Sequence, residues 1–328
     1  MPIIVAKDNS GDFSTITEAL DSIPYSNTER QIILVREGTY KEKLTIDKPY
    51  ITLKGESTHK VILTYDDSSS TLMQDGTYLG TFRSQTLFID ADDISVQNIT
   101  VYNTAGTKME NAKALAVYID GDRISFKNCA FYSDQTIFNG PLPPTDYEKC
   151  TFTAVKELTP RNFGRHYFKN CYIEGVSDII FGTATAYFEH CTIKAWGAPE
   201  MDENTKSNGH FLAPATCADQ EFGYVFSECR FCGPNRPSQF FIGHSWREYA
   251  KAVLIHCELD EHIHPEGWHH MRRPNAIQNS FFAEYNCYGF GADTSERISW
   301  LRTIDDEDLL EYSKENVLAG ADNWGQYL

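Results

Sequence analysis

Apolar residues recur along the chain in a short pattern that changes phase in its middle. The pattern reads apolar-x-apolar-x-x-apolar-x-apolar, so alternation at period two runs over one strand, shifts, and resumes. The shift indicates a bend at which the chain turns a corner while its apolar side chains continue to face inward. Five segments carry the pattern, at 94–101, 124–131, 186–193, 224–231 and 252–259.

The spacing of these segments predicts how the strands pair. Most intervals between them are about 20 to 40 residues, with Gly, Asn and Asp in between, which favours stacked parallel rungs over hairpins, since hairpins need two-residue turns. We therefore predict an all-β fold, a single-domain right-handed parallel β-helix over 1–328. The solenoid is expected to occupy about 1–300 and a helical tail 301–328.

Both ends of such a solenoid need covers, because an open rung exposes unpaired backbone. Thr15 and Glu18 form a capping box ahead of an apolar run, which predicts a short helix that ends before Pro24 and caps the N-terminal end. In the acidic segment 305–316, Leu309 and Tyr312 fall at helical spacing. That segment is expected to lie along the outside of the solenoid or over its far end.

The net charge and the hydropathy of the chain disfavour several classes of binding partner. The 328 residues include 29 Lys and Arg against 46 Asp and Glu, a formal charge of -17, which disfavours nucleic acid and anionic membranes as partners. An anionic substrate would need a local cationic site. No stretch approaches the roughly 18 apolar residues of a membrane span, and the first residues lack an export signal. We expect a monomer in the cytoplasm, or a secreted protein if a signal segment has been removed.

The nine cysteines have a structural explanation, and we expect no metal and no cofactor. Five of them occupy the same inward position of successive rungs, where they act as small hydrophobes: Cys129, Cys171, Cys191, Cys229 and Cys257. Cys229 and Cys232 lack a second pair for a zinc site. The histidines of 262–270 lack a third ligand at suitable spacing and are expected at the surface.

Four motifs resemble the pectin methylesterase family. They are GTYKE at 38–42, NTAG at 103–106, SDIIFG at 177–182 and GW at 267–268, and the similarity continues to about residue 300. The resemblance implies a right-handed parallel β-helix whose cleft binds polygalacturonate, in an aspartyl esterase that removes methyl groups without a metal. Pectin degradation and cell wall modification, in a bacterium, are the biological roles that it suggests.

The resemblance assigns a nucleophile. In that family one aspartate attacks the ester carbonyl, a second protonates the departing methanol, a glutamine helps form the oxyanion hole, and an arginine holds the nucleophile. The two carboxyl groups need environments that push their pKa values apart. Asp178 stands at the nucleophile's position. The alternative is an aspartate that only stabilises a turn at a rung corner.

The other three positions depart from the family pattern. Lys113 replaces the oxyanion glutamine and can still donate hydrogen bonds. Asp134 and Gln135 stand in a segment one residue shorter than usual. Either Gln135 keeps its family place and the acid is deleted, or the corner is rebuilt and Asp134 supplies the acid. His244 replaces the arginine and would pair with Asp178 as a cation only near or below a pKa of about 6.5, or would donate a proton.

Aromatic and cationic residues near these positions are candidates for substrate binding. Trp246, Trp268 and Phe181 lie where rings would stack on sugars, although core packing is the common role of a tryptophan. Arg165 and Arg247, like Lys113 and His244, would receive galacturonate carboxylates, and each has a solvated surface charge as its alternative.

A proline-rich segment at 139–145 predicts a stiff loop. The repeat pattern would make Tyr147, Cys150 and Phe152 an extra rung, whereas the resemblance places them in this loop. We favour the loop.

The sequence therefore predicts a pectinesterase-like carbohydrate esterase that hydrolyses methyl esters of pectin or oligogalacturonides with Asp178 as nucleophile. One alternative is a catalytically impaired homologue that binds uronate oligosaccharides. Another is an esterase for a different ester. Polygalacturonases and pectate lyases fit less well, because neither clustered aspartates nor a calcium site with a basic catalyst is evident.

Overall fold

The computed structural model describes residues 1–105, 113–141, 163–196, 207, 209–233, 239–271 and 273–328. The chain divides into two compact units, Met1–Gly164 with Lys169–Tyr172, and Arg165–Phe168 with Ile173–Leu328. Each unit is described by itself below. The predicted extra rung at Tyr147, Cys150 and Phe152 lies outside the described residues.

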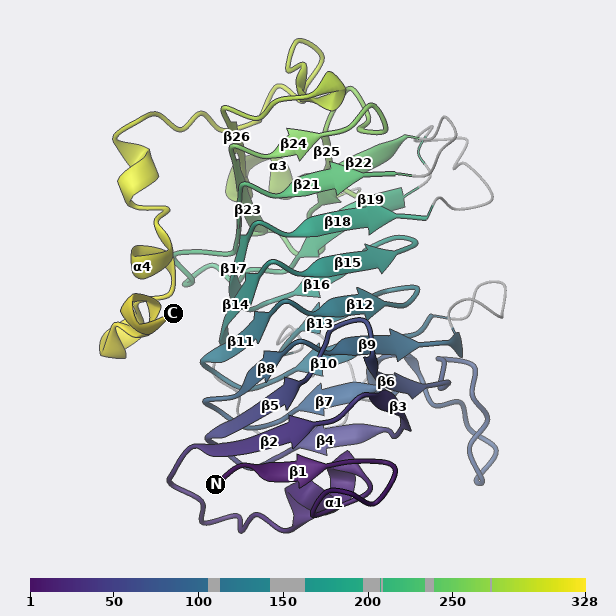
Figure 1. Ribbon diagram of the computed structural model, residues 1–328. Coiled ribbons are helices and arrows are strands. Elements are labelled where there is room, and N and C mark those ends of the chain that lie inside the picture. Colours follow the sequence, from purple (N-terminus) through teal and green to yellow (C-terminus); the bar gives the residue numbers. More distant parts are fainter. Residues whose placement is uncertain (106–112, 142–162, 197–206, 208, 234–238, 272) are drawn as a thin grey trace. The chain divides into compact units, whose positions relative to one another are not determined.

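The first unit consists of three parallel sheets, whose stacked strands run from purple to blue in Figure 1. Residues pair in simple register, as when Gln31 lies beside Ile51 and Val35 beside Gly55. One sheet contains β1 (Ile3–Val5), β2 (Gln31–Val35), β5 (Ile51–Gly55), β8 (Ser95–Gln97) and β11 (Ile124–Lys127). The second contains β3 (Gly38–Lys41), β6 (Val61–Tyr65), β9 (Thr100–Asn103) and β12 (Ala130–Tyr132). The third contains β4 (Leu44–Ile46), β7 (Leu87–Ile89), β10 (Val117–Ile119) and β13 (Ile137–Asn139).

The second unit repeats this arrangement with three further sets of parallel strands (Figure 1). One set contains β14 (Arg165–Lys169), β17 (Thr185–Glu189), β20 (Tyr224–Ser227), β23 (Lys251–Ile255) and β26 (Phe281–Tyr285). The next contains β15 (Tyr172–Gly175), β18 (Thr192–Ala195), β21 (Arg230–Cys232) and β24 (Glu258–Leu259). The last contains β16 (Ile180–Gly182), β19 (Gly209–Pro214), β22 (Phe240–His244) and β25 (Trp268–His269). These parallel rungs confirm the predicted all-β, parallel β-helix fold.

One corner of each rung explains the phase shift in the sequence pattern. The residue at the bend adopts a left-handed conformation, with φ of 53° at Asn128 and 52° at Asn170. Asparagine tolerates this conformation. Its side-chain amide also forms a hydrogen bond to the neighbouring rung: Asn128 donates to Asn98 at 3.1 Å and Asn170 donates to Asn128 at 3.3 Å.

The residue after the bend is the predicted inward cysteine. Cys129, Cys171, Cys191, Cys229 and Cys257 are all buried and unbridged. The thiol of Cys191 lies 3.5 Å from the carbonyl oxygen of Phe168, and that of Cys229 lies 3.4 Å from the carbonyl oxygen of Phe188, so the thiols donate across the rungs. The cysteines are therefore part of the core, as predicted.

The predicted N-terminal helix is α1 (Ile16–Asp21), and Thr15 and Glu18 form its capping box. Its apolar side packs against β1 and β4. Glu42, the last residue of the GTYKE motif, accepts hydrogen bonds from the backbone amides of Ile16 (3.0 Å) and Thr17 (2.8 Å). This carboxylate satisfies amides that the helix itself leaves unpaired, so the motif's glutamate attaches α1 to the sheet.

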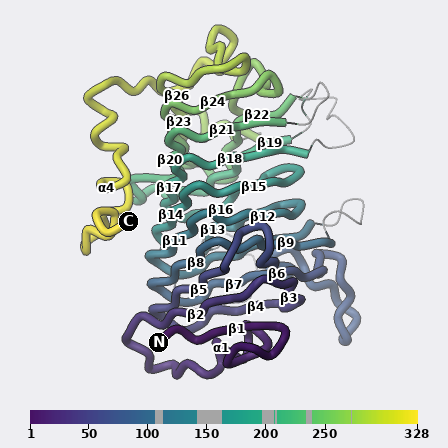
Figure 2. The backbone as a smooth tube through the Cα atoms, in the orientation of Figure 1, coloured from purple at the N-terminus to yellow at the C-terminus, as the bar shows by residue number. Residues whose placement is uncertain are grey.

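The C-terminal segment lies along the outer face of β14, β17, β20 and β23, as the yellow tube of Figure 2 shows. Val317 and Leu318 are buried there against Tyr167 and Val253. The segment is built from short helical turns, η4 (Asp308–Leu310), α4 (Lys314–Val317), η5 (Gly320–Asp322) and η6 (Trp324–Tyr327). The remaining short helices are η1 (Thr81–Arg83), α3 (Ala276–Asn279) and η3 (Phe290–Ala292). Of the two predicted positions for the tail, the structure has the one along the outside.

Arg165 holds this segment in place. Its guanidinium pairs with Asp322 and donates to the carbonyl oxygen of Ala319 at 2.8 Å, while the Trp324 ring lies 5.8 Å away. The prediction that Arg165 binds substrate is wrong, because its charge is already used on the outer face of the rungs. None of the helices in the described part of the chain has the length and apolar character that a membrane crossing needs.

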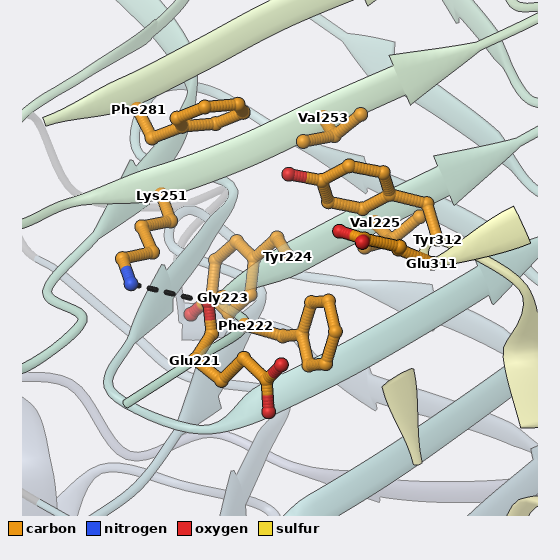
Figure 3. Close-up of a pocket in the computed structure, with 10 residues that line it drawn as sticks. All are labelled: Glu221, Phe222, Gly223, Tyr224, Val225, Lys251, Val253, Phe281, Glu311 and Tyr312. Carbon is orange, nitrogen blue, oxygen red and sulfur yellow. Dashed lines mark hydrogen bonds between the residues drawn. The ribbon is translucent and has the colours of Figure 1, made fainter. Parts of the chain in front are cut away.

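A cavity of about 220 Å³ lies between this outer face and the C-terminal segment. Figure 3 shows Phe222, Phe281 and Tyr312 around it, with the ammonium of Lys251 turned to the backbone oxygen of Glu221 at 3.1 Å. None of the residues that the sequence predicts for catalysis or substrate binding lines this cavity, so the candidate site is elsewhere.

Candidate active site

Asp178 lies in a tight corner just before β16. Its φ of 48° is unusual for a residue other than glycine, and two hydrogen bonds to β19 stabilise it. The Asp178 amide donates to the His210 carbonyl oxygen at 2.7 Å, and the His210 amide donates to the Ser177 hydroxyl oxygen at 3.2 Å. A side chain at Gly209 would approach that hydroxyl to 2.8 Å, so this glycine permits the close packing.

In the structure, the side chains of Asp178 and His244 are in contact. Nε2 of His244, the last residue of β22, lies 3.0 Å from Oδ1 of Asp178. The histidine side chain is 5% exposed and the carboxylate side chain 26% exposed, so the carboxylate faces solvent while its partner is buried. A fixed donor and an accessible oxygen suit a nucleophile.

The environment of His244 favours one tautomer. Its Nδ1 is buried and has no hydrogen-bond partner among the described residues. A proton on Nδ1 would leave a buried donor unsatisfied, which costs about 1–3 kcal/mol. The proton therefore belongs on Nε2, from which it is donated to Asp178. In this tautomer Nε2 of His244 holds the carboxylate as a hydrogen-bond donor.

His210 is a site residue that the sequence analysis missed. Its Nδ1 lies 3.7 Å from Oδ1 of Asp178, and its ring meets that of His244 edge-on at 4.5 Å. Among the described residues, one group of His, Cys, Asp or Glu brings three potential metal ligands within 4.8 Å of one another, and it consists of Asp178, His210 and His244. The signal that could have identified His210 is its position in β19, one rung before the rung of His244.

The neighbouring histidines are not the surface residues that we expected. His264 and His269 stack on Phe241 at 4.2 and 5.1 Å, and His262 is buried. Burial lowers the pKa of His269, as does its proximity to His270 and His244, and burial also lowers the pKa of His264. Both rings are therefore favoured in the neutral form beside the site.

Phe181 and Trp246 form an aromatic wall beside the site. Phe181 in β16 lies 5.6 Å from Trp246, and the guanidinium of Arg247 lies 4.9 Å from the Trp246 ring while it donates to the Trp246 carbonyl oxygen at 2.8 Å. Trp246 and Arg247 are partly exposed, whereas Phe181 is buried. An apolar ring next to a cation suits a uronate, although the binding roles of all three stay predictions.

Trp268 does not belong to that wall. It is fully buried, stacks on Phe282 at 4.3 Å, and donates from Nε1 to Glu284 at 3.0 Å. The prediction that Trp268 stacks on a sugar is wrong, because packing and a buried hydrogen bond already use its ring.

The remaining predicted residues belong to the first unit, where the structure ties two of their segments together. The carbonyl oxygen of Ala114 accepts from the Gln135 amide (3.0 Å) and from the Ser133 hydroxyl (2.7 Å). Lys113 is exposed, Asp134 is half-buried, and Gln135 is buried. Their oxyanion and acid roles stay predictions.

The fold and the site together are a parallel β-helix with a partly exposed carboxylate at a rung corner. A family model described as Pectinesterase matches residues 2–139 and 145–321. Pectinesterase 31 of Arabidopsis thaliana is 30% identical over 313 residues, 93% of this chain and 88% of that protein. The chain therefore belongs to the pectinesterase family, whose members are carboxylic ester hydrolases.

Solved structures of pectin methylesterases support the same family and fold. The pectin methylesterase from carrot has a TM-score of 0.78 at 25% identity and covers 98% of this chain and 94% of its own. That from Aspergillus niger has a TM-score of 0.77 at 29% identity, over 100% and 96%. The predicted family and right-handed β-helix are confirmed. The predicted bacterial origin stays a prediction, since these relatives come from plants and a fungus.

Proposed function

We propose that this chain hydrolyses methyl esters of pectin or oligogalacturonides, with Asp178 as the nucleophile. Membership of the pectinesterase family supports the reaction class. The observation that carries the residue assignment is the 3.0 Å contact between His244 and the partly exposed carboxylate of Asp178. A carboxylate held in one orientation by a buried donor is positioned to attack an ester that arrives from solvent.

The chemistry that this arrangement supports has two steps. A carboxylate oxygen of Asp178 attacks the ester carbonyl carbon, the C–OCH₃ bond breaks, and the methoxide takes a proton from the general acid and leaves as methanol. The resulting anhydride is then hydrolysed by water, which releases the free acid, regenerates the carboxylate and returns the proton. The Nε2 donor of His244 orients the nucleophile.

Two roles come from the resemblance. Lys113, as an exposed ammonium, is proposed to stabilise the oxyanion, and Asp134 to supply the general acid. The alternative is that Gln135 keeps its family place and the acid is deleted. Trp246, Phe181 and Arg247 are proposed to contact the sugar chain. We further propose a monomer in the cytoplasm that has neither nucleic acid nor a membrane as a partner.

Methanol release from methyl-esterified pectin and from short methylated oligogalacturonides tests the proposal. Asp178→Ala should lower release at least about a thousandfold, because the covalent step is lost. Asp219→Ala, at an exposed aspartate of the same unit, is the matched control and should behave as wild type. Thermal unfolding of both variants shows whether the fold is kept.

Two results would contradict the proposal. Release that persists in a folded Asp178→Ala variant would remove Asp178 from the mechanism. No release by the wild-type protein on either substrate would favour the uronate-binding homologue, which the altered positions Lys113 and His244 also permit. Direct oligogalacturonide binding would then identify that second function.

A further inference from the structure

We infer that Asp178, His210 and His244 form a binding site for a divalent transition-metal ion of the zinc type. The sequence gives no hint of it, because each residue lies on a different rung. The structure brings Oδ1 of Asp178 to 3.0 Å from Nε2 of His244 and 3.7 Å from Nδ1 of His210.

These distances match the geometry of a coordinated ion. Zinc binds imidazole nitrogen and carboxylate oxygen at about 2.0–2.2 Å, so two ligands at the tetrahedral angle lie about 3.4 Å apart. The two observed distances lie on either side of that value. An ion in the centre of the group would thus need only small side-chain movements, and a fourth position would remain open on the solvent side of Asp178.

The chemistry of the donors fits as well. Two neutral imidazoles and one carboxylate are a ligand set that zinc and similar divalent ions prefer. Their backbones are held in place, because Asp178 and His210 are joined by the hydrogen bond between the Asp178 amide and the His210 carbonyl. His244 is buried at the end of β22.

Binding changes the state of His244. The ion takes the place of the Nε2 proton, which moves to Nδ1, so no proton is lost overall. The buried Nδ1–H then has no partner among the described residues, a cost that the coordination bonds must exceed. The same ion engages Oδ1 of Asp178, the oxygen that His244 orients. A bound ion therefore blocks the nucleophile, and this inhibition rests on the proposed function, whereas the binding itself does not.

Cobalt and zinc titrations test the site in full-length protein without a polyhistidine tag. Co²⁺ should saturate at one ion per chain with absorption in the visible, and Zn²⁺ should displace it. His210→Asn and Asp178→Asn should each weaken Co²⁺ binding at least about tenfold, whereas His190→Asn, at an exposed histidine of the same unit, should not. Unfolding temperatures near that of wild type establish that the variants are folded.

Binding that is absent, or that is equally tight in His210→Asn, would overturn the inference. In the activity assay, Zn²⁺ should abolish methanol release and a chelator should restore it. Release that rises with Zn²⁺ would overturn the inhibitory role. The two proposals fail separately: Co²⁺ binding through His210 without any methanol release rejects only the esterase, and methanol release without Co²⁺ binding rejects only the metal site.

Discussion

Two carboxylates of the second unit each meet a basic side chain, and they differ in how completely they are enclosed. Glu284 receives Arg297 at both oxygens (2.9 and 3.1 Å) and Trp268 at 3.0 Å, and the Glu284 and Arg297 side chains are 2% and 3% exposed. Asp178 receives His244 at one oxygen and keeps 26% of its side chain exposed.

The difference separates a structural pair from a reactive one. A carboxylate whose oxygens are enclosed by fixed donors has no accessible lone pair for attack. Removing its cationic partner leaves a buried, unpaired charge. A carboxylate that is held by a donor and keeps part of its side chain exposed is oriented and still accessible. The family motifs around Glu284 thus serve the fold. Gly267, with φ of 68°, is one example, because a side chain there would meet the Arg297 Cδ at 2.5 Å.

Breaking the structural pair should have the largest effect on stability. Arg297→Ala leaves Glu284 buried without its cation, so we expect the free energy of unfolding to fall by about 3–5 kcal/mol. Denaturant unfolding measures it. The control is Arg230→Ala, whose side chain is 51% exposed and should contribute less than about 1 kcal/mol. Equal losses in the two variants would contradict the structural role of Glu284 and Arg297.

Trp268 and Trp246 should differ in the same way, the first affecting stability and the second substrate binding. Trp268→Ala opens a cavity and removes a donor from Glu284, which should cost about 3–5 kcal/mol of unfolding free energy. Trp246→Ala should cost about 1 kcal/mol or less and instead raise the KM for oligogalacturonides, because its ring is partly exposed. Unfolding and steady-state kinetics on both variants measure the contrast. A KM unchanged in Trp246→Ala would remove it from substrate binding.

Loosening the reactive pair should affect catalysis more than stability. His244→Ala removes one hydrogen bond to a charged oxygen, worth about 1.5–3 kcal/mol, so kcat/KM should fall roughly 10- to 100-fold. His190→Ala is the control and should retain full activity. His244→Arg introduces the arginine expected from the family resemblance, and activity equal to or above wild type would show that histidine is a substitute for that clamp. Full activity in His244→Ala would remove the pair from the mechanism.

The smallest effect is expected at Arg165. Arg165→Ala loses the pair with Asp322 and the bond to Ala319, which should lower the free energy of unfolding by about 1–2 kcal/mol. Methanol release and the KM should not change, because the side chain lies under the C-terminal segment. A raised KM in a folded variant would return Arg165 to the substrate site.

The sequence alone supported the rungs, α1 and the inward cysteines, because these depend on local signals. Period-two alternation, a left-handed corner residue and a capping box each act within a few residues. The motif that contains Asp178 and the substitution at His244 also identified two of the three residues in the cluster of Asp178, His210 and His244. Lys113, Asp134 and Gln135 were reached by the same route, and only activity measurements on their variants will assign their roles.

The contacts between residues of different rungs could be identified only from the tertiary structure. His210 lies beside Asp178, Trp268 packs onto Phe282, and Arg165 holds the C-terminal segment. In each case the partners are separated by connections of unequal length, so the sequence pattern contains no fixed interval from which the pairing follows. The chain by itself determined which residues face inward and which carry chemistry. Stacking of the rungs decided which of them meet, because packing, and not sequence distance, sets the register between one rung and the next.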